Sequence, residues 1–352
     1  IGELILPGAR FPLQMAQDPD VGSNSLLSYQ LTENPSFKLE VKESQDGSRQ
    51  PELVLEAALD REKQSSFQMV LTAMDGGSPA RSGTVQIRIN VTDANDNAPV
   101  FSKSTYEARV RENVPTGSLV LQVRATDADA GSNGRVSYSF SNVPDAVLAV
   151  FSIDGDRGDI RNVGILDFEL RNKYTFAVEA TDGGGLNGHC KVYIEITDEN
   201  DNAPEITTLS VSSSVPEDAP PGTVVALIKV RDRDSGENGK VWCELEGESP
   251  LSIVASSGSS YKVPELVLEE ALDREKQSSF QMVLTAMDGG SPARSGTVQI
   301  RINVTDANDN APVFSKSTYE ARVRENVPTG SLVLQVRATD ADAGSNGRIS
   351  YS

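Results

Sequence analysis

Clusters of aspartate, asparagine and glutamate recur along the chain in a form that suits a hard cation. The segment "DENDNAPEI" begins at Asp198, and "DANDNAPVF" begins at Asp93 and again at Asp306. Carboxylates packed this closely repel one another unless a cation lies among them. Ca²⁺ takes six to eight oxygens from carboxylates, amide side chains and backbone carbonyls, which these segments offer within a short span. They therefore predict calcium sites, and a solvated polar linker is the alternative for any one segment taken alone.

Four further acidic elements recur in phase with these segments. They are "D-x-D", "LD-x-E", a lone Asp that ends an apolar alternation, and a Glu that precedes a Gly and a β-rich run. The "D-x-D" pairs begin at Asp18, Asp127, Asp232 and Asp340, at intervals of about 105–109 residues. A period of this length corresponds to one domain rather than to one hairpin. Five motif types in phase over several domains favour a metal site over a solvated linker.

The segments between the acidic motifs alternate apolar and polar residues. The inward sets are Leu119, Leu121, Val123 and Ala125, then Tyr174, Phe176, Val178 and Ala180, then Cys190, Val192, Ile194 and Ile196. Period-two runs of this kind, broken by Gly, Pro, Asn and Asp, predict half-buried antiparallel strands. About seven such strands in roughly 100 residues predict a two-sheet Greek-key sandwich. The predicted fold class is all-β, with β-sandwich repeats in tandem.

Length, charge and cysteine content limit the possible functions. The chain has 352 residues and a formal net charge of −19, so nucleic acid and anionic membrane surfaces are poor partners whereas metal cations suit it. Its two cysteines, Cys190 and Cys243, cannot make a disulfide scaffold and are predicted to be buried thiols. No apolar run reaches the roughly 18 residues of a membrane span, and Ile1 does not open a signal peptide. We therefore expect a soluble internal piece of a longer protein.

The acidic motifs together resemble the calcium signature of the extracellular repeats of cadherins. The segments "FPLQMAQDPDVGSNSLLSYQL", "YEARVRENVPTGSLVLQVRATDADAGSNGR" and "VPEDAPPGTVVALIKVRDRDSGENG" look like the second, third and fourth repeats of a clustered protocadherin. This resemblance implies immunoglobulin-like sandwiches joined by linkers that each bind about three Ca²⁺ when complete. It also implies an ectodomain at the extracellular face of the plasma membrane, whose single membrane anchor is not in this chain.

The resemblance carries the calcium-binding positions of the family onto acidic and amide residues at the linkers, with Asn238 binding through its carbonyl. They are Asp18, Asp20, Asn24, Asp75, Asp60, Glu62, Asp93, Asn95, Asp96, Asn97, Asp127, Asp129, Asn133, Asp182, Glu112, Asp167, Glu169, Asp198, Asn200, Asp201, Asn202, Asp232, Asp234, Asn238, Asp288, Glu217, Asp273, Glu275, Asp306, Asn308, Asp309, Asn310, Asp340, Asp342 and Asn346.

The same resemblance predicts four repeats and one weak linker. The first predicted repeat, 1–98, lacks its first strand, and the second, 99–203, is complete. The third, 204–311, has a second half that duplicates 51–98. Residues 312–352 are the start of a further repeat. The Glu at the start of a domain is assigned at Glu112 and Glu217, and the first repeat is expected to lack it. That Glu bridges two closely spaced ions in the family. We therefore expect the first linker to hold this pair of ions weakly.

One internal duplication is unusual for a chain of this family. Residues 51–139 and 264–352 are identical apart from Ala57/Glu270 and Val136/Ile349, and the join after Val263 is in register with the fold. Recombination between duplicated genes, a designed chimera or an assembly error would each produce it.

Three classes of function are open at this point. The first is calcium-dependent adhesion between opposing cells, in which like or closely related protocadherins pair in antiparallel through repeats that include residues 1–203. The second is a calcium-stiffened stalk that does not recognise itself. The third is an enzyme, which we do not expect, because the one histidine, His189, lies on an outward strand face and no nucleophile–base pair or cofactor motif is present.

Three smaller features have two interpretations each. Residues 157–159, Arg-Gly-Asp, form an integrin-type tripeptide or a hairpin turn that enters a strand. The sequons at Asn90 and Asn303 suit an extracellular glycoprotein but lie close to the metal linkers. Trp242 points outward in the alternation of its strand, so it belongs to an interface or lies under a neighbouring loop.

Overall fold

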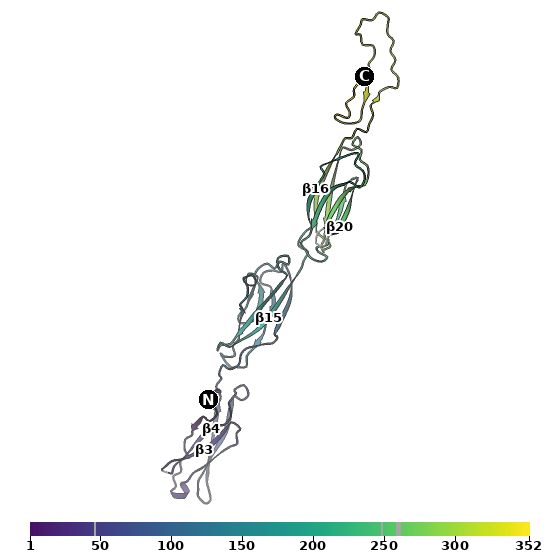
Figure 1. Cartoon of the computed structure of the whole chain (residues 1–352). Helices are drawn as coiled ribbons and strands as arrows, with labels where there is room; N and C mark the ends of the chain where they lie inside the picture. The colour runs from purple at the N-terminus through teal and green to yellow at the C-terminus, as the bar shows by residue number, and fades with distance from the viewer. Residues whose placement is uncertain (46, 248, 258–261) are drawn as a thin grey trace. The chain divides into compact units, whose positions relative to one another are not determined.

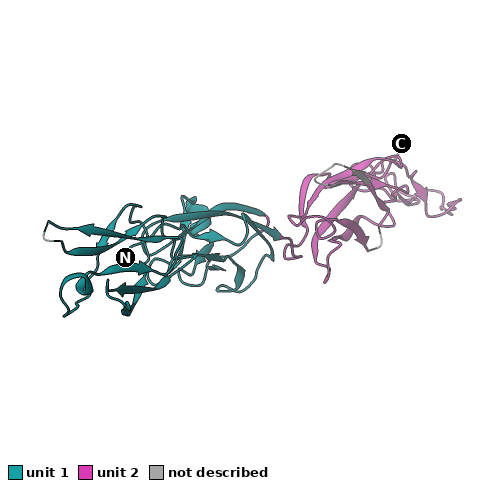
Figure 2. Ribbon diagram, turned by 90° about the horizontal axis from the view of Figure 1, so that it is seen from below, with its two compact units in different colours: residues 1–167, 171–196 teal, residues 168–170, 197–352 magenta. Residues whose placement is uncertain are grey.

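The computed structural model describes residues 1–45, 47–247, 249–257 and 262–352. They fall into two compact units, which are residues 1–167 with 171–196 and residues 168–170 with 197–352 (Figure 2). Strands make up almost all of the regular structure, and the one α-helix in the described part is α1 (Asp145–Leu148). The all-β fold class is confirmed (Figure 1).

The first sandwich packs a sheet of order β1–β4–β3 against a sheet of order β2–β5–β6, with a 3-10 turn, η1 (Gly22–Ser25), before β2. Its strands are β1 (Arg10–Pro12), β2 (Ser28–Leu31), β3 (Phe37–Glu43), β4 (Arg49–Leu55), β5 (Ser66–Met74) and β6 (Ser82–Asn90). The rings of Phe37 and Phe67 meet edge to face in its core, with their centroids 5.3 Å apart.

The second sandwich has sheets of order β11–β14–β15–β8 and β12–β13–β9, and β7 pairs with β10. Its strands are β7 (Val100–Phe101), β8 (Thr105–Arg111), β9 (Leu119–Gln122), β10 (Ala125–Thr126), β11 (Ser137–Ser141), β12 (Phe151–Ile153), β13 (Asp159–Asn162), β14 (Lys173–Thr181) and β15 (Asn187–Thr197).

The third sandwich has sheets of order β16–β18–β21–β20 and β17–β23–β22–β19, and the residues after it form one small pair, β24–β25. The strands are β16 (Glu205–Val211), β17 (Ser214–Pro216), β18 (Val224–Arg231), β19 (Trp242–Glu246), β20 (Leu251–Ser257), β21 (Lys262–Leu268), β22 (Ser279–Met287), β23 (Ser295–Thr305), β24 (Val313–Phe314) and β25 (Ala338–Thr339).

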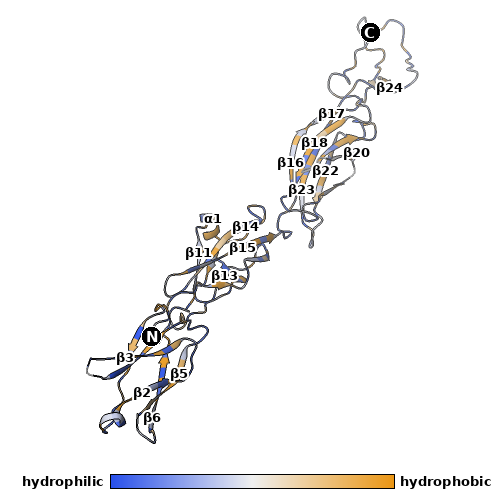
Figure 3. Ribbon diagram, turned by 60° about the horizontal axis from the view of Figure 1, so that its bottom comes forward, coloured by the Kyte–Doolittle hydropathy of each residue, from blue (hydrophilic) through white to orange (hydrophobic). Residues whose placement is uncertain are grey.

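The alternation predicted from the sequence is confirmed in β14 and β15, where every second residue is buried. Figure 3 shows the hydrophobic residues gathered on the strands. The prediction of one continuous strand over residues 119–125 is wrong, because the chain divides there into β9 and β10. Leu119 of its predicted inward set is 53% exposed. The amide of Val123 bonds to the carbonyl of Gly158 (2.9 Å) between the two strands, so the ladder changes partner at this point.

The first strand of a complete sandwich is shared between its two sheets. In the third sandwich, β16 pairs with β18 in one sheet and β17 runs parallel to β23 in the other. In the first sandwich, the described residues contain only the end of this element, a parallel bridge between Gly2 and Thr92. In the third sandwich, β16 pairs with residues 226–231 of β18, which correspond to residues 12–17, and the described residues of the first sandwich contain no strand in that place. The predicted repeat boundaries stay predictions.

Candidate metal centre

Glu3 occupies the position at the first linker where the sequence was expected to lack an acid. It is 3% exposed, and its two carboxylate oxygens accept the backbone N–H groups of Arg61 (2.7 Å) and Ala94 (2.6 Å). Glu217 at the third linker makes the same two bonds, to Arg274 (2.7 Å) and Ala307 (2.6 Å). The expectation that the first sandwich lacks this Glu is therefore wrong, and the weak first linker loses its basis.

The signal for Glu3 was present in the sequence. Glu3 precedes Gly8 by the same spacing at which Glu112 precedes Gly117 and Glu217 precedes Gly222. It was missed because so few residues precede it that the strand before it has no sequence pattern. In the structure, its amide donates to the carbonyl of Thr92 (3.3 Å), as the amide of Glu217 donates to Thr305 (3.1 Å).

Carboxylates from three parts of the chain converge at the first linker. Oxygens of Glu3, Glu62 and Asp93 lie within 4.8 Å of one another, and a second group of the same size joins Glu62 to Asp96 and Asp129. Glu62 belongs to both groups, so the groups share a ligand. Paired sites with a shared carboxylate fit two neighbouring dications.

Asp93 and Asp129 are fixed in place by hydrogen bonds across the linker. The oxygens of Asp93 accept from the amide of Ala130 (2.9 Å) and from Nδ2 of Asn133 (2.9 Å). Asn97 donates from Nδ2 to Asp129 (2.7 Å). The bond from Asn133 to Asp93 engages only Nδ2 of Asn133, so its backbone carbonyl, the group predicted to bind at the equivalent Asn238, stays available to a metal together with its Oδ1.

A third group of acceptors at the first linker is buried without a partner in the described residues. These atoms are Oδ1 of Asn95, Oδ2 of Asp127 and Oδ2 of Asp182. At the middle linker the equivalent three atoms, of Asn200, Asp232 and Asp288, are buried in the same state. An acceptor buried without a donor costs about 1–3 kcal/mol, so native structures rarely leave several together. A cation would satisfy all three.

The second unit repeats this arrangement at its own linkers. Oxygens of Glu169, Asp198 and Asp234 lie within 4.8 Å of one another, as do those of Glu217, Glu275 and Asp306. Asn238 donates to Asp198 (2.8 Å), and at the third linker Asn346 donates to Asp306 (3.0 Å). Asn202 and Asn310 hold Asp234 and Asp342 in the way that Asn97 holds Asp129.

Comparison with known proteins agrees with this geometry. The model of the Cadherin domain matches residues 3–92, 106–197 and 211–305. The chain belongs to the cadherin family. It is 49% identical over its whole length to human protocadherin gamma-B2, of which it spans 38%. Cadherin domains bind calcium at the linkers between them, and the acidic clusters here are compatible with that property.

Solved protocadherin structures share the cadherin fold of this chain. Extracellular cadherin domains 1–5 of protocadherin gamma B2 superpose with a TM-score of 0.93 at 48% identity, covering 99% of this chain and 65% of that one. A structure described as the cis-dimer of protocadherin gammaB7 EC3-6 superposes with a TM-score of 0.67 at 28% identity, covering 86% of this chain and 74% of that one. None of the helices in the described part is long and apolar enough to cross a bilayer.

An arginine enters the acidic cluster at two of the three cadherin linkers. Arg61 donates a hydrogen bond to Glu62 and forms an ion pair with Asp93, and its Nη2 also donates to the carbonyl of Ala128 (3.2 Å). Arg274 does the same at the third linker, with Glu275, Asp306 and Ala341. The middle linker has Phe168 at this position. At the middle linker an arginine from another element, Arg294, reaches the linker backbone instead, through Nε to the carbonyl of Asn200 (2.7 Å).

Burial and mutual repulsion raise the pKa of several of these carboxyl groups. Burial is the largest influence on the pKa of Asp234 and raises it; hydrogen bonds from Asn202 come next and lower it, and the charges of Asp198 and Asp201 add smaller increases. Burial and the charge of Glu3 likewise raise the pKa of Glu62. These groups ionise more readily once a cation lies among them.

The cluster at Asp18 and Asp20 is not completed within the described residues. The amide of Asp20 donates to Oδ1 of Asp18 (2.9 Å), and Oδ1 of Asp75 accepts from the amides of Gly77 (3.1 Å) and Arg81 (2.9 Å). No acidic linker segment faces them in the part of the chain that the structure describes. Their assignment, with Asn24, stays a prediction.

The structure decides between the interpretations of the Arg-Gly-Asp tripeptide. Asp159 is 8% exposed and begins β13, and its carboxylate pairs with Arg161 (3.0 Å). Gly158 has a φ of +69°, as a tight turn requires. The hairpin-turn interpretation is confirmed, because the acid that an integrin would bind is buried.

The remaining predicted side chains lie mostly as expected. Trp242 is outward and 41% exposed, and the side chain of His189 is 53% exposed. Cys190 is buried, which raises the pKa of its thiol to about 11. Cys243 is only half-buried, so the expectation of a buried thiol is wrong there.

Proposed function

We propose that this chain is part of an adhesion ectodomain whose cadherin repeats are made rigid by calcium and pair with like molecules on opposing cells. The observation that carries the calcium assignment is the equivalent trio of buried, partnerless acceptors at two linkers. The adhesive part rests on the similarity to protocadherin ectodomains. The same similarity supports an extracellular location at the plasma membrane and glycosylation at the exposed Asn90 and Asn303.

Each complete linker would hold about three ions. At the first linker, Glu3, Asp60, Glu62 and Asp96 would hold the close pair, and Asn95, Asp127 and Asp182 the third ion. Asp93 and Asp129 would also serve the close pair, because their oxygens lie within 4.8 Å of those of Glu62. By equivalence of sequence position, Glu112 and Asp167 are the counterparts of Glu3 and Asp60 at the middle linker.

The charges explain why calcium would stiffen the chain. Eight carboxylates are assigned to the middle linker by sequence against about three dications, so the charge of a full site would be nearly balanced. Without the ions, these acids repel one another through a site that excludes part of the solvent. Extracellular calcium modules bind at about 10⁻⁴–10⁻³ M, so millimolar external calcium would fill these sites and cytosolic calcium would not.

Homophilic recognition is tested by aggregation of beads coated with the ectodomain that contains this chain. Beads are expected to aggregate in millimolar calcium and to stay dispersed in chelator. Exchange of outward strand residues within 1–203 for those of a related protocadherin should redirect the choice of partner. If the beads still aggregate but the choice of partner does not change after that exchange, the result favours the alternative, in which this chain is a calcium-stiffened stalk. Calcium binding without aggregation would favour the same alternative.

Glu3 and Glu217 should contribute equally to calcium binding at their linkers. We expect Glu3→Ala and Glu217→Ala each to weaken the affinity of two ions at least about tenfold, because each removes a charge and up to two ligand oxygens. Calorimetric calcium titration of each variant measures this, with the exposed Glu33→Ala as a matched control. Loss of affinity with Glu217→Ala alone would contradict the role assigned to Glu3.

A further inference from the structure

The third residue of the "LD-x-E" element differs between the three linkers. It is Arg61 at the first linker, Phe168 at the middle linker and Arg274 at the third. Arg61 and Arg274 are duplicates of one another, so the middle linker is the natural comparison for both. The acids on either side of this position are present at all three linkers, and the residue between them is what varies.

The guanidinium of Arg61 lies among the carboxylates of the first linker. Its Nη2 donates to Oε1 of Glu62 (2.5 Å), and its Nε forms an ion pair with Asp93. Both acids belong to the group whose oxygens lie within 4.8 Å of one another. The side chain of Arg61 is 18% exposed, so water screens little of the attraction between this charge and the acids.

The same guanidinium links the first sandwich to the second. Nη2 of Arg61 also donates to the carbonyl of Ala128, which belongs to the "D-x-D" element of the second sandwich. Arg274 makes the corresponding contacts at the third linker, with Asp306 (2.6 Å) and with the carbonyl of Ala341 (3.3 Å). A cation held between the acids of one repeat and the backbone of the next would keep the linker ordered before any ion binds.

The residues at the equivalent positions of the middle linker do not repeat this arrangement. Phe168 is half-buried and carries no charge. Arg233 replaces Ala128 in the "D-x-D" element, but its side chain is 63% exposed and its Nη2 lies 4.0 Å from Glu205. The carboxylates of the linker nevertheless converge, as they do at the first linker. They are those of Glu169, Asp198 and Asp234.

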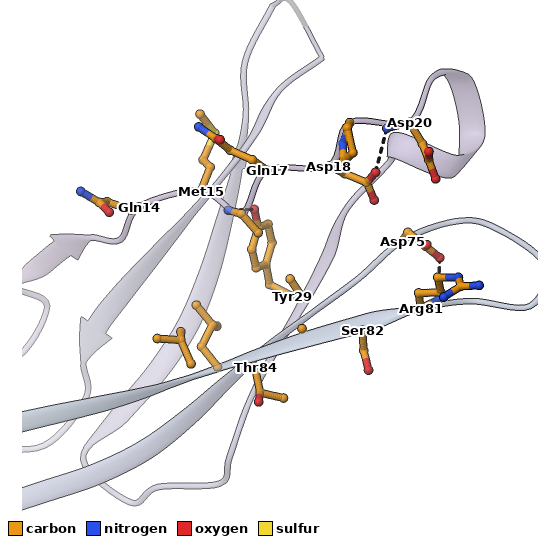
Figure 4. Close-up of a pocket in the computed structure, with 16 residues that line it drawn as sticks. Gln14, Met15, Gln17, Asp18, Asp20, Tyr29, Asp75, Arg81, Ser82 and Thr84 are labelled. Carbon is orange, nitrogen blue, oxygen red and sulfur yellow. Dashed lines mark hydrogen bonds between the residues drawn. The ribbon is translucent and has the colours of Figure 1, made fainter.

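Arg294, the other arginine near the middle linker, serves the hairpin before β23. Its amide donates to Asp288, and its Nε to the carbonyl of Asn200. Figure 4 shows its duplicate, Arg81, bonded in the same way to Asp75. Asn200 and Asp288 supply buried acceptors assigned to the third ion. Arg294 therefore does not take the place of Arg61 at the close pair of ions.

We propose, on the basis of the calcium binding proposed above, that the third residue of "LD-x-E" sets the calcium affinity of each linker. An arginine there is a counter-charge within the chain, with which calcium must compete. Because it offsets the charges of Glu62 and Asp93, it lessens the repulsion that an incoming ion relieves. Once an ion is bound, the same guanidinium repels it. The arginine thus lowers calcium affinity and keeps the linker ordered when calcium is scarce.

Exchange of this residue between linkers tests the proposal in the whole chain. Arg61→Phe should raise the calcium affinity of the first linker at least about tenfold, and Phe168→Arg should lower that of the middle linker by a similar factor. Calcium titration followed by nuclear magnetic resonance separates the linkers. The amides of Ala130 and Ser235 report on the first and the middle linker, because each donates to a predicted ligand (2.9 and 3.1 Å).

Two further variants separate charge from side-chain shape and from position. Arg61→Lys keeps the charge, so it should change the affinity of the first linker less than about threefold. Arg157→Phe removes an exposed arginine from the turn before β13, outside the predicted ligands, and should leave that affinity unchanged. In chelator, Arg61→Phe should lower the melting temperature, because the acids of the linker lose their counter-charge.

The sign of the change in affinity decides the outcome. If the linkers bind calcium but Arg61→Phe weakens the binding or leaves it unchanged, the arginine only supports its loop and does not set the affinity. Calcium binding by the linkers would then still stand. If the unchanged chain binds no calcium at these linkers, the proposed function fails together with the role of the arginine.

Discussion

Millimolar calcium is expected to raise the melting temperature of the chain and to narrow the spread of its conformations, and chelation to reverse both effects. For a dissociation constant of about 10⁻⁴–10⁻³ M, calcium at about 10 mM stabilises the folded state by about 1.4–2.7 kcal/mol per independent ion. Several ions at several linkers make this the largest effect expected of any single change in conditions. Scanning calorimetry measures the stability, and small-angle scattering measures the radius of gyration.

Magnesium at equal concentration is the control for ionic strength. Mg²⁺ demands near-octahedral geometry and keeps its water, so it should not replace calcium among these mixed carboxylate and amide ligands. Screening alone would act equally with both salts. Equal melting temperatures and equal radii of gyration in chelator and in calcium would contradict the calcium assignment.

The fold was predictable because its signal is local. Alternation in β14 and β15 assigns the inward face residue by residue, and a ladder of nine or more residues keeps that register. The split between β9 and β10 was not predictable. It depends on the amide of Val123 meeting the carbonyl of Gly158, which lies far away in sequence, so no periodicity near residue 123 reports it.

The candidate metal residues were predictable for a different reason. The motifs recur, so a match at one linker can be checked against another, and Asn200 and Asp288 come together as Asn95 and Asp182 do. The arginine in the cluster was not inferred, because "LDRE" does not show whether its third residue turns toward solvent or toward the acids. That direction is set by the carbonyl of Ala128, across the linker from Arg61.

Asp288→Asn is expected to reverse its effect on stability between chelator and calcium. Asp288 is fully buried. Its Oδ1 accepts from the amides of Gly290 (3.0 Å) and Arg294 (3.0 Å) and from Nδ2 of Asn200 (3.3 Å), while Oδ2 has no partner in the described residues. In chelator, the substitution removes a buried charge and keeps the three hydrogen bonds to Oδ1. It should therefore stabilise the third sandwich by about 1–3 kcal/mol.

In calcium, the same substitution should be destabilising, because it replaces an anionic ligand of the third ion by an amide N–H group. Loss of that ion would cost about 1.4–2.7 kcal/mol at about 10 mM calcium. Thermal unfolding of the variant in both conditions measures the change of sign. Asp156→Asn is the control, since Asp156 is 80% exposed and lies in the turn between β12 and β13, outside the predicted ligands. It should change little with calcium. A variant of Asp288 that is less stable in both conditions, by equal amounts, would show that this carboxylate supports the loop and does not hold an ion.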